Sequence, residues 1–117
     1  QKAFRKTQIH NVSRSTVNRR NVYGETVLHR AVHCRDVDLI RKVIKAGGNV
    51  NSSDYSGWTP LNEASVRGFC EVAKELLKAG ADVDARGLGQ MTPLQNAVKE
   101  GYYEVYSKLN TNYGLGV

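Results

Sequence analysis

The sequence has few of the residues from which disulfide scaffolds, membrane spans and many active sites are built. Its 117 residues include two cysteines, three histidines, one tryptophan and one methionine. Two cysteines cannot form a disulfide framework, so Cys34 and Cys70 are predicted to be reduced thiols of a nuclear or cytoplasmic protein. No apolar run approaches the ~18 residues that a membrane-spanning helix needs, and no signal-peptide pattern opens the chain. We therefore expect neither membrane insertion nor secretion.

Acidic residues are missing from positions 1–20, a segment that holds six basic ones. The rest of the chain therefore holds 11 of the 17 basic residues and all 11 acidic residues, so the net charge of +6 belongs to this segment. The segment has no sustained helical or strand period and is rich in Ser, Thr, Asn, Lys and Arg. It is predicted to be a basic flexible arm over residues 1–20. One interpretation is a solvated linker, and the alternative is contact with nucleic acid or an acidic partner.

Constellations that would carry catalysis or hold a cofactor are also missing. The sequence has no nucleophile–base pair, no triad and no glycine-rich phosphate loop after a strand. His29 and His33 lie four residues apart beside Cys34, a spacing that metal ligands use, but no second ligand pair accompanies them. We therefore predict no metal, no cofactor and no enzymatic activity.

What the sequence does have is an internal repeat. Three segments share one pattern at an even spacing: Gly24–Ala31, Gly57–Ala64 and Gln90–Ala97. The positions that recur at this spacing are Thr26, Thr59 and Thr92, then Leu28, Leu61 and Leu94, then Ala31, Ala64 and Ala97. A fixed period of roughly 20 to 50 residues is typical of a solenoid, in which each unit packs mainly against its neighbours.

Each unit is predicted to contain two short helices. In the first unit, the apolar spacing favours one helix near Val27–Val32 and a second over Val37–Ala46. In the second unit, Thr59 is suited to an N-cap and Pro60 to the first helical position. In the third unit, Asn110 replaces the apolar residue of the earlier units. This change predicts a terminal capping unit, and the alternative is that further repeats continue.

Two motifs carry a resemblance to a known family. Gly57-Trp58-Thr59-Pro60-Leu61 and Ala79-Gly80-Ala81-Asp82-Val83-Asp84 resemble the turn and closing segments of ankyrin repeats, and the spacing of the three units matches the ankyrin period. The resemblance implies an all-α solenoid of three helix-turn-helix repeats joined by short β-turn connections. It covers residues 21–117, divided as 21–53, 54–86 and 87–117. It also implies a non-catalytic protein-binding domain, which we expect to be monomeric.

A narrower resemblance concerns Arg20–Thr26 and Asp54–Ala64. These stretches are similar to a nuclear ankyrin subgroup in chromatin and DNA repair. Its members include the Tonsoku-like factor, the RING partner of the breast-cancer susceptibility protein, the SMC-complex localisation factor, and ankyrin-repeat chromatin and meiotic cofactors. The resemblance implies a reader of the unmodified histone H4 tail in the nucleus. This chain departs from the subgroup pattern at Asn62, Ser65, Val66, Gln95 and Asn96.

In an ankyrin stack the turns and the first helices line a concave groove. We expect the ligand there to contact Tyr23, Glu25, Asp54, Tyr55, Trp58, Glu63, Met91 and Asn96. Trp58 stands where the fold requires no aromatic residue, and Trp and Tyr commonly dominate interface energies. Glu25, Asp54 and Glu63 could surround a basic ligand side chain. The alternatives are that Trp58 packs locally and that Asp54 bonds its own turn.

These observations predict a protein-interaction module that binds a peptide or protein segment in the groove. A histone H4 tail is the leading ligand. The alternatives are an adaptor for an unrelated protein partner, and weak nucleic-acid contact through residues 1–20.

Overall fold

The computed structural model describes residues 12–112, and the predictions for residues 1–11 and 113–117 lie outside that range. The described range contains no β-strand, so the predicted all-α class is confirmed. Its α-helices are α1 (Val27–His33), α2 (Val37–Lys45), α3 (Pro60–Arg67), α4 (Cys70–Lys78), α5 (Pro93–Glu100) and α6 (Tyr103–Asn112). A short 3₁₀ helix, η2 (Leu88–Gln90), lies between α4 and α5.

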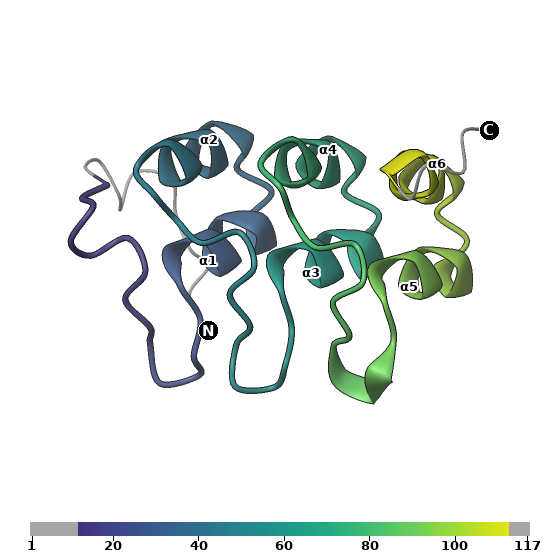
Figure 1. The fold of residues 1–117 in the computed structure, drawn as a ribbon, viewed down its shortest axis with the longest axis horizontal. Helices are drawn as coiled ribbons and strands as arrows, with labels where there is room; N and C mark the ends of the chain where they lie inside the picture. The colour runs from purple at the N-terminus through teal and green to yellow at the C-terminus, as the bar shows by residue number, and fades with distance from the viewer. Residues whose placement is uncertain (1–11, 113–117) are drawn as a thin grey trace.

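The helices form two layers, as Figure 1 shows. The first helix of each pair lies in one layer, where α3 packs between α1 and α5. The second helix of each pair lies in the other layer, where α4 packs between α2 and α6. Long turns project beyond the first layer (Figure 1). The molecule is thus a stack of helix pairs, as the repeat period predicts.

Each first helix begins directly after an N-cap threonine whose own backbone is extended. Thr59 Oγ1 accepts the backbone N–H of Asn62 at 3.2 Å, and Asn62 Oδ1 accepts the backbone N–H of Thr59 at 3.1 Å. This reciprocal pairing satisfies two donors that a helix start leaves free. Pro60 occupies the first helical position, as predicted, because no hydrogen bond is needed there.

The core runs between the layers, and its members recur at the repeat spacing. Ala31, Ala64 and Ala97 are all fully buried. The small side chain at this position lets neighbouring first helices approach closely. Gly68 ends α3 in the left-handed region, with φ 73°, and a Cβ there would lie 2.8 Å from the ring of Tyr102. A glycine is therefore required both by the backbone and by the ring that covers it.

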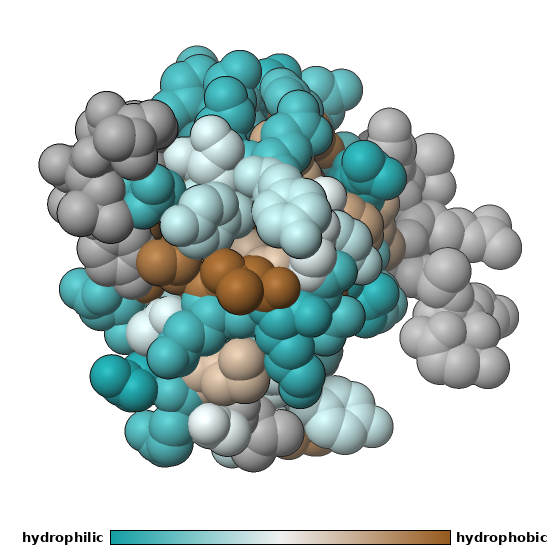
Figure 2. All heavy atoms as spheres, turned by 90° about the vertical axis from the view of Figure 1, so that its right-hand side faces the viewer, coloured by the Kyte–Doolittle hydropathy of each residue, from teal (hydrophilic) through white to brown (hydrophobic). Residues whose placement is uncertain are grey.

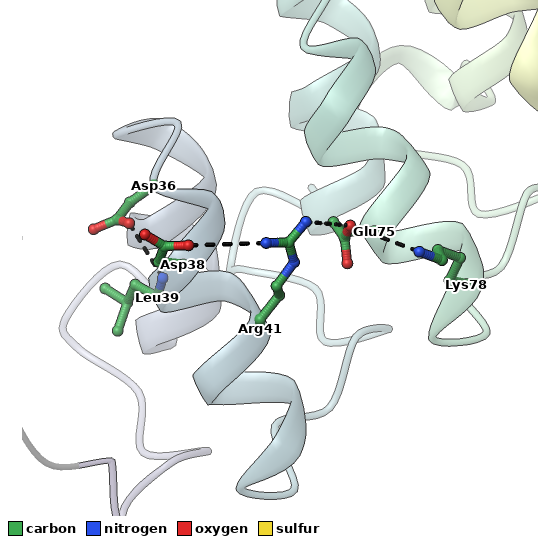
Figure 3. A network of polar contacts seen from close by, with 6 residues as sticks. All are labelled: Asp36, Asp38, Leu39, Arg41, Glu75 and Lys78. Atoms are coloured by element: carbon green, nitrogen blue, oxygen red, sulfur yellow. Dashed lines mark hydrogen bonds and ion pairs between the residues drawn. The ribbon is translucent and has the colours of Figure 1, made fainter.

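An ion pair joins α2 to α4 on the second layer (Figure 3). Arg41 Nη2 donates to Glu75 Oε2 at 2.9 Å, while Asp38 lies 3.8 Å from Arg41 and Lys78 lies 3.9 Å from Glu75. The side chain of Glu75 is largely buried, whereas that of Arg41 is half exposed. The hydrogen bond from Arg41 is the main reason that the pKa of Glu75 is lowered.

Residues 12–20 differ from the predicted flexible arm. Val17 is 2 % exposed, within the hydrophobic core. Asn18 Oδ1 accepts the backbone N–H of Asn49 at 2.8 Å, and Asn18 Nδ2 donates to the carbonyl of Gly47 at 3.2 Å. Asn51, one repeat later, makes the same pair of bonds to Asp82 and Gly80. Residues 14–18 therefore occupy the place in the stack that 47–51 and 80–84 occupy in later repeats.

Candidate protein-binding surface

The projecting turns are built on the same backbone hydrogen bonds. The first residue of each turn donates its N–H to the carbonyl of the residue four positions later: Asn21 to Glu25, Asp54 to Trp58 and Gly87 to Met91, at 2.9, 2.8 and 3.0 Å. Neighbouring turns also touch, since the N–H of Tyr55 donates to the carbonyl of Tyr23 at 3.0 Å. Glu25, Trp58 and Met91 thus close successive turns, and each is half-buried. We call the surface formed by the turns 21–25, 54–58 and 87–91 and by the N-terminal ends of α1, α3 and α5 the turn face.

Exposed apolar and aromatic side chains gather at the first two turns. Val22, Tyr23 and Tyr55 are 82 %, 68 % and 72 % exposed. The Tyr55 ring packs against Gly24, where a Cβ would lie 2.5 Å from it, so the ring has a fixed support. Large exposed apolar groups that the core does not need are typical of binding surfaces. Tyr23 and Tyr55 are therefore available to a ligand on the turn face.

The predicted acidic site residues are already engaged within the chain. Asp54 Oδ1 accepts the N–H groups of Ser56 and Trp58, both at 2.9 Å. Asp54 therefore bonds its own turn, as the alternative interpretation held. Glu25 Oε1 accepts Nδ2 of Asn21 at 2.8 Å.

Glu63 lies between two basic side chains. Its Oε2 accepts a close hydrogen bond from Arg67 Nε and lies 3.4 Å from His33 Nδ1. Two basic side chains of the chain itself thus already neutralise Glu63, which weakens the attraction it would exert on a ligand lysine. Arg67 is not among the predicted site residues, although an acidic residue four positions before a basic one on a helix signals such a pair.

Both the backbone N–H and the carbonyl of Trp58 are hydrogen-bonded to side chains. Its N–H donates to Asp54, and its carbonyl accepts Nε2 of His29 at 3.0 Å. His29 Nδ1 accepts the N–H of Thr26, so the ring proton must be on Nε2, which donates to Trp58. The histidine of the repeat motif thus fixes the turn that presents Trp58.

Asn96 does not lie at an accessible position. It is 5 % exposed, and its Nδ2 atom is buried without a hydrogen-bond partner among residues 12–112. A ligand on the turn face could not reach this amide without moving α5. The structure therefore brings the other predicted site residues to the turn face and leaves Asn96 inside.

The described residues also include a half-buried thiol and an open hollow outside the turn face. Within residues 12–112 there is no group of three or more His, Cys, Asp or Glu that could hold a metal. Burial, then the charge of Glu104, raises the pKa of the Cys70 thiol, which disfavours the reactive thiolate. An open hollow of about 240 Å³ between α2 and α4 is lined by the Arg41–Glu75 pair and by Ile44, Lys45, Lys78 and Ala79. None of the described helices has the length and apolar content to cross a membrane.

The repeated turns, capped helices and two-layer stack agree with comparison to known families. The family described as "Ankyrin repeats (3 copies)" matches residues 4–87. The chain belongs to the ankyrin-repeat family. The match starts at residue 4, ahead of the predicted boundary at 21, which agrees with the repeat-like bonds of Asn18. Residues 88–112 lie beyond the match and follow the same period in α5 and α6.

Several longer proteins contain a related segment. Human "Ankyrin repeat domain-containing protein 31" is 49 % identical over 64 residues, which are 55 % of this chain and 3 % of that protein. "SMC5-SMC6 complex localization factor protein 1" from Bos taurus is 43 % identical over 54 residues, 45 % of this chain and 5 % of that protein. "Tonsoku-like protein" from Bos taurus is 42 % identical over 43 residues, 37 % of this chain and 3 % of that protein. The chain thus spans a small fraction of each relative, and ankyrin repeats are in general non-enzymatic protein-interaction modules.

Proposed function

We propose that this ankyrin domain binds an extended peptide or protein segment across its turn face. The observation that carries the proposal is the pair of exposed tyrosines, Tyr23 and Tyr55, on neighbouring turns beside Trp58. Aromatic side chains on supported turns give a large contact area at a small cost in side-chain entropy. Because the first two turns are bonded to one another, this part of the surface needs little reorganisation on binding.

The ligand is a nuclear protein segment, and the unmodified histone H4 tail is its leading candidate. The sequence similarity to nuclear ankyrin proteins, and the names "SMC5-SMC6 complex localization factor" and "Tonsoku-like" among the relatives, support a role in chromatin or DNA repair in the nucleus. The partners of Glu63 and Asp54 change how such a tail would bind. Aromatic contacts, including a cation–π contact of about 0.5–2 kcal/mol from a lysine to Trp58, would replace a cradle of three acids.

A basic arm that binds nucleic acid has weaker support. Arg20 Nη1 donates to the carbonyls of Gly24 and Ser53, at 2.7 and 2.5 Å, so this side chain is used to join two turns. Arg14 and Arg19 are exposed. Binding through these residues would fall steeply with added salt.

The test is a titration of H4 tail peptide followed by fluorescence anisotropy of a labelled peptide. Tyr23→Ala is expected to weaken binding by about tenfold or more, as at interface hot spots. Tyr103→Ala is the matched control, because Tyr103 is 77 % exposed on α6, outside the turn face. Equal effects of the two substitutions would remove the turn face as the site.

A scrambled peptide of equal charge tests whether binding depends on the sequence of the H4 tail or only on its charge. If it binds as well as the H4 tail, the histone proposal is wrong and the adaptor alternative gains. If binding survives Tyr23→Ala but disappears when the exposed Arg14 and Arg19 are both replaced by Gln, or when salt is raised, the ligand contacts the basic segment instead.

A further inference from the structure

The outer side of α5 and α6 keeps the side chains that earlier repeats use to bind the next repeat. Three positions illustrate this, each followed across the stack from one repeat to the next. Leu28 and Leu61 are 1 % exposed, whereas Leu94 is half-exposed. Val32 and Ser65 are fully buried, whereas Val98 is 55 % exposed. Ile40 and Ala73 are fully buried, whereas Tyr106 is half-exposed.

Figure 2 views this end of the molecule. Hydrophobic residues gather near its centre and hydrophilic residues surround them (Figure 2). An apolar centre with a polar rim is the usual anatomy of a protein interface. A capping repeat would instead have a polar outer face. Asn110, from which a cap was predicted, is buried and does not make this face polar.

A hydrogen-bond donor is left over at the same face. His29 and Asn62 each accept the N–H of the threonine that starts their helix, through Nδ1 and Oδ1, and each has a second atom, Nε2 or Nδ2, that donates to a main-chain carbonyl farther along the stack. Those second bonds join His29 Nε2 to the Trp58 carbonyl at 3.0 Å and Asn62 Nδ2 to the Ala85 carbonyl at 3.1 Å.

Gln95 completes only the first half of this pattern. Its Oε1 accepts the N–H of Thr92 at 2.9 Å, while its Nε2 has no partner among residues 12–112. In the other two repeats the corresponding partner is a main-chain carbonyl in or just before the next turn.

We propose that the outer face of α5 and α6 binds a further ankyrin repeat, stacked in the same register as the others. The face is the counterpart, on α5 and α6, of the sides of α3 and α4 that pack against α5 and α6. Val98 and Leu94 supply apolar area to such a repeat, and Gln95 Nε2 donates to a carbonyl of its incoming turn. The choice of a further ankyrin repeat as the binding partner thus rests on the pattern of apolar positions and one hydrogen-bond donor, and not only on the exposed area of the face.

The experiment compares the original chain with an extended chain, in which a copy of residues 52–86 follows Val117 and continues the repeat register. Unfolding in urea is followed by circular dichroism and by Trp58 fluorescence. We expect the extended chain to unfold in one transition, at a higher urea concentration than the original. Val98→Asp should lower the folding equilibrium constant of the extended chain by about tenfold or more, since it buries a charge. In the original chain it should change that constant by less than about threefold.

Val22→Asp is the matched control, because it introduces the same change at an exposed valine on the turn face. Val22→Asp should leave the folding equilibrium constants of both chains nearly unchanged. Two results would overturn the proposal: an appended repeat that unfolds separately with no effect on the original transition, or an equal cost of Val98→Asp in both chains. A concentration-dependent dimer of the original chain that Val98→Asp dissociates would assign the face to a second copy and would also overturn it. These measurements do not involve peptide binding, so they succeed or fail independently of the proposed function.

Discussion

His29, Asn62 and Gln95 occupy one position of the repeat with three different side chains. In each case one atom accepts the N–H of the threonine at the helix start. The position therefore selects for an acceptor and a donor at the right separation, and not for imidazole as such. The shorter Asn62 reaches the Ala85 carbonyl, whereas His29 reaches the carbonyl of the residue that closes the next turn.

Removing the Asn62 amide should destabilise the domain. Asn62 is fully buried, and Asn62→Ala would leave the Thr59 N–H and the Ala85 carbonyl without their partner. We expect a loss of about 2–3 kcal/mol in the free energy of unfolding. Asn62→His should cost much less, because an imidazole at this position reaches the Met91 carbonyl as His29 reaches that of Trp58.

Urea unfolding of the two variants and of the parent chain measures this difference. Fluorescence of Trp58 and circular dichroism should give the same midpoint, which checks that the transition is cooperative. Similar losses for Asn62→Ala and Asn62→His would mean that shape rather than hydrogen bonding governs the position.

At the scale of elements, most of the fold could be predicted from the sequence. The helices predicted near Val27–Val32 and over about Val37–Ala46 correspond to α1 (Val27–His33) and α2 (Val37–Lys45). This agreement follows from apolar spacing, threonine caps and the period, which are local signals. The placement of Val17 and Asn18 was missed because the closing segment of a repeat is only a few residues long. The repeated Val-Asn pairs at 17–18 and 50–51 were the available signal.

The candidate site could be predicted only in part. Residue type and repeat position nominated Trp58 and Tyr55, whose roles stay predictions, and local turn chemistry gave Asp54 its alternative role. The burial of Asn96 depends on how α5 packs against its neighbours, which periodicity alone does not determine. The exposed fraction of a given first-helix position differs between repeats. Aligning the three repeats therefore does not predict how deeply each side chain is buried.

The contact between α2 and α4 should make stability depend on pH. Arg41 lowers the pKa of Glu75 in the folded state, so the unfolded state binds the proton more readily. The stabilisation from this pair is therefore complete above the unfolded pKa of about 4.3 and is lost as pH falls through the lowered folded value. We expect Glu75→Gln to reduce the fall in stability between about pH 5 and pH 3, and to lower stability at pH 7.

Urea unfolding at a series of pH values gives this profile. Glu71→Gln is the control, because Glu71 is an exposed carboxylate on the same helix. It should retain the parent's pH dependence. If Glu75→Gln and Glu71→Gln gave the same profile as the parent, the Arg41–Glu75 pair would contribute nothing measurable to pH sensitivity.

At the scale of the whole molecule, the position of a repeat in the stack should decide how much stability it controls. The α3–α4 pair packs against neighbours on both sides, whereas α5 and α6 pack against the rest of the described chain on one side only. In a solenoid, stability is close to a sum of repeat and nearest-neighbour terms. Loss of the middle repeat breaks two interfaces, and loss of the end repeat breaks one.

Leu76 and Leu109 provide a matched test of this difference, since they lie one period apart and both are fully buried. Leu76→Ala should lower the free energy of global unfolding by about 2–5 kcal/mol and speed amide exchange throughout α1–α6. Leu109→Ala removes the same atoms, but we expect it to speed exchange mainly in α5 and α6 through local unfolding of the end repeat. Native-state hydrogen exchange followed by NMR distinguishes the two. Uniform loss of protection in Leu109→Ala would show that the repeats unfold as one unit, because the α3–α5 and α4–α6 interfaces would then be too strong to open separately.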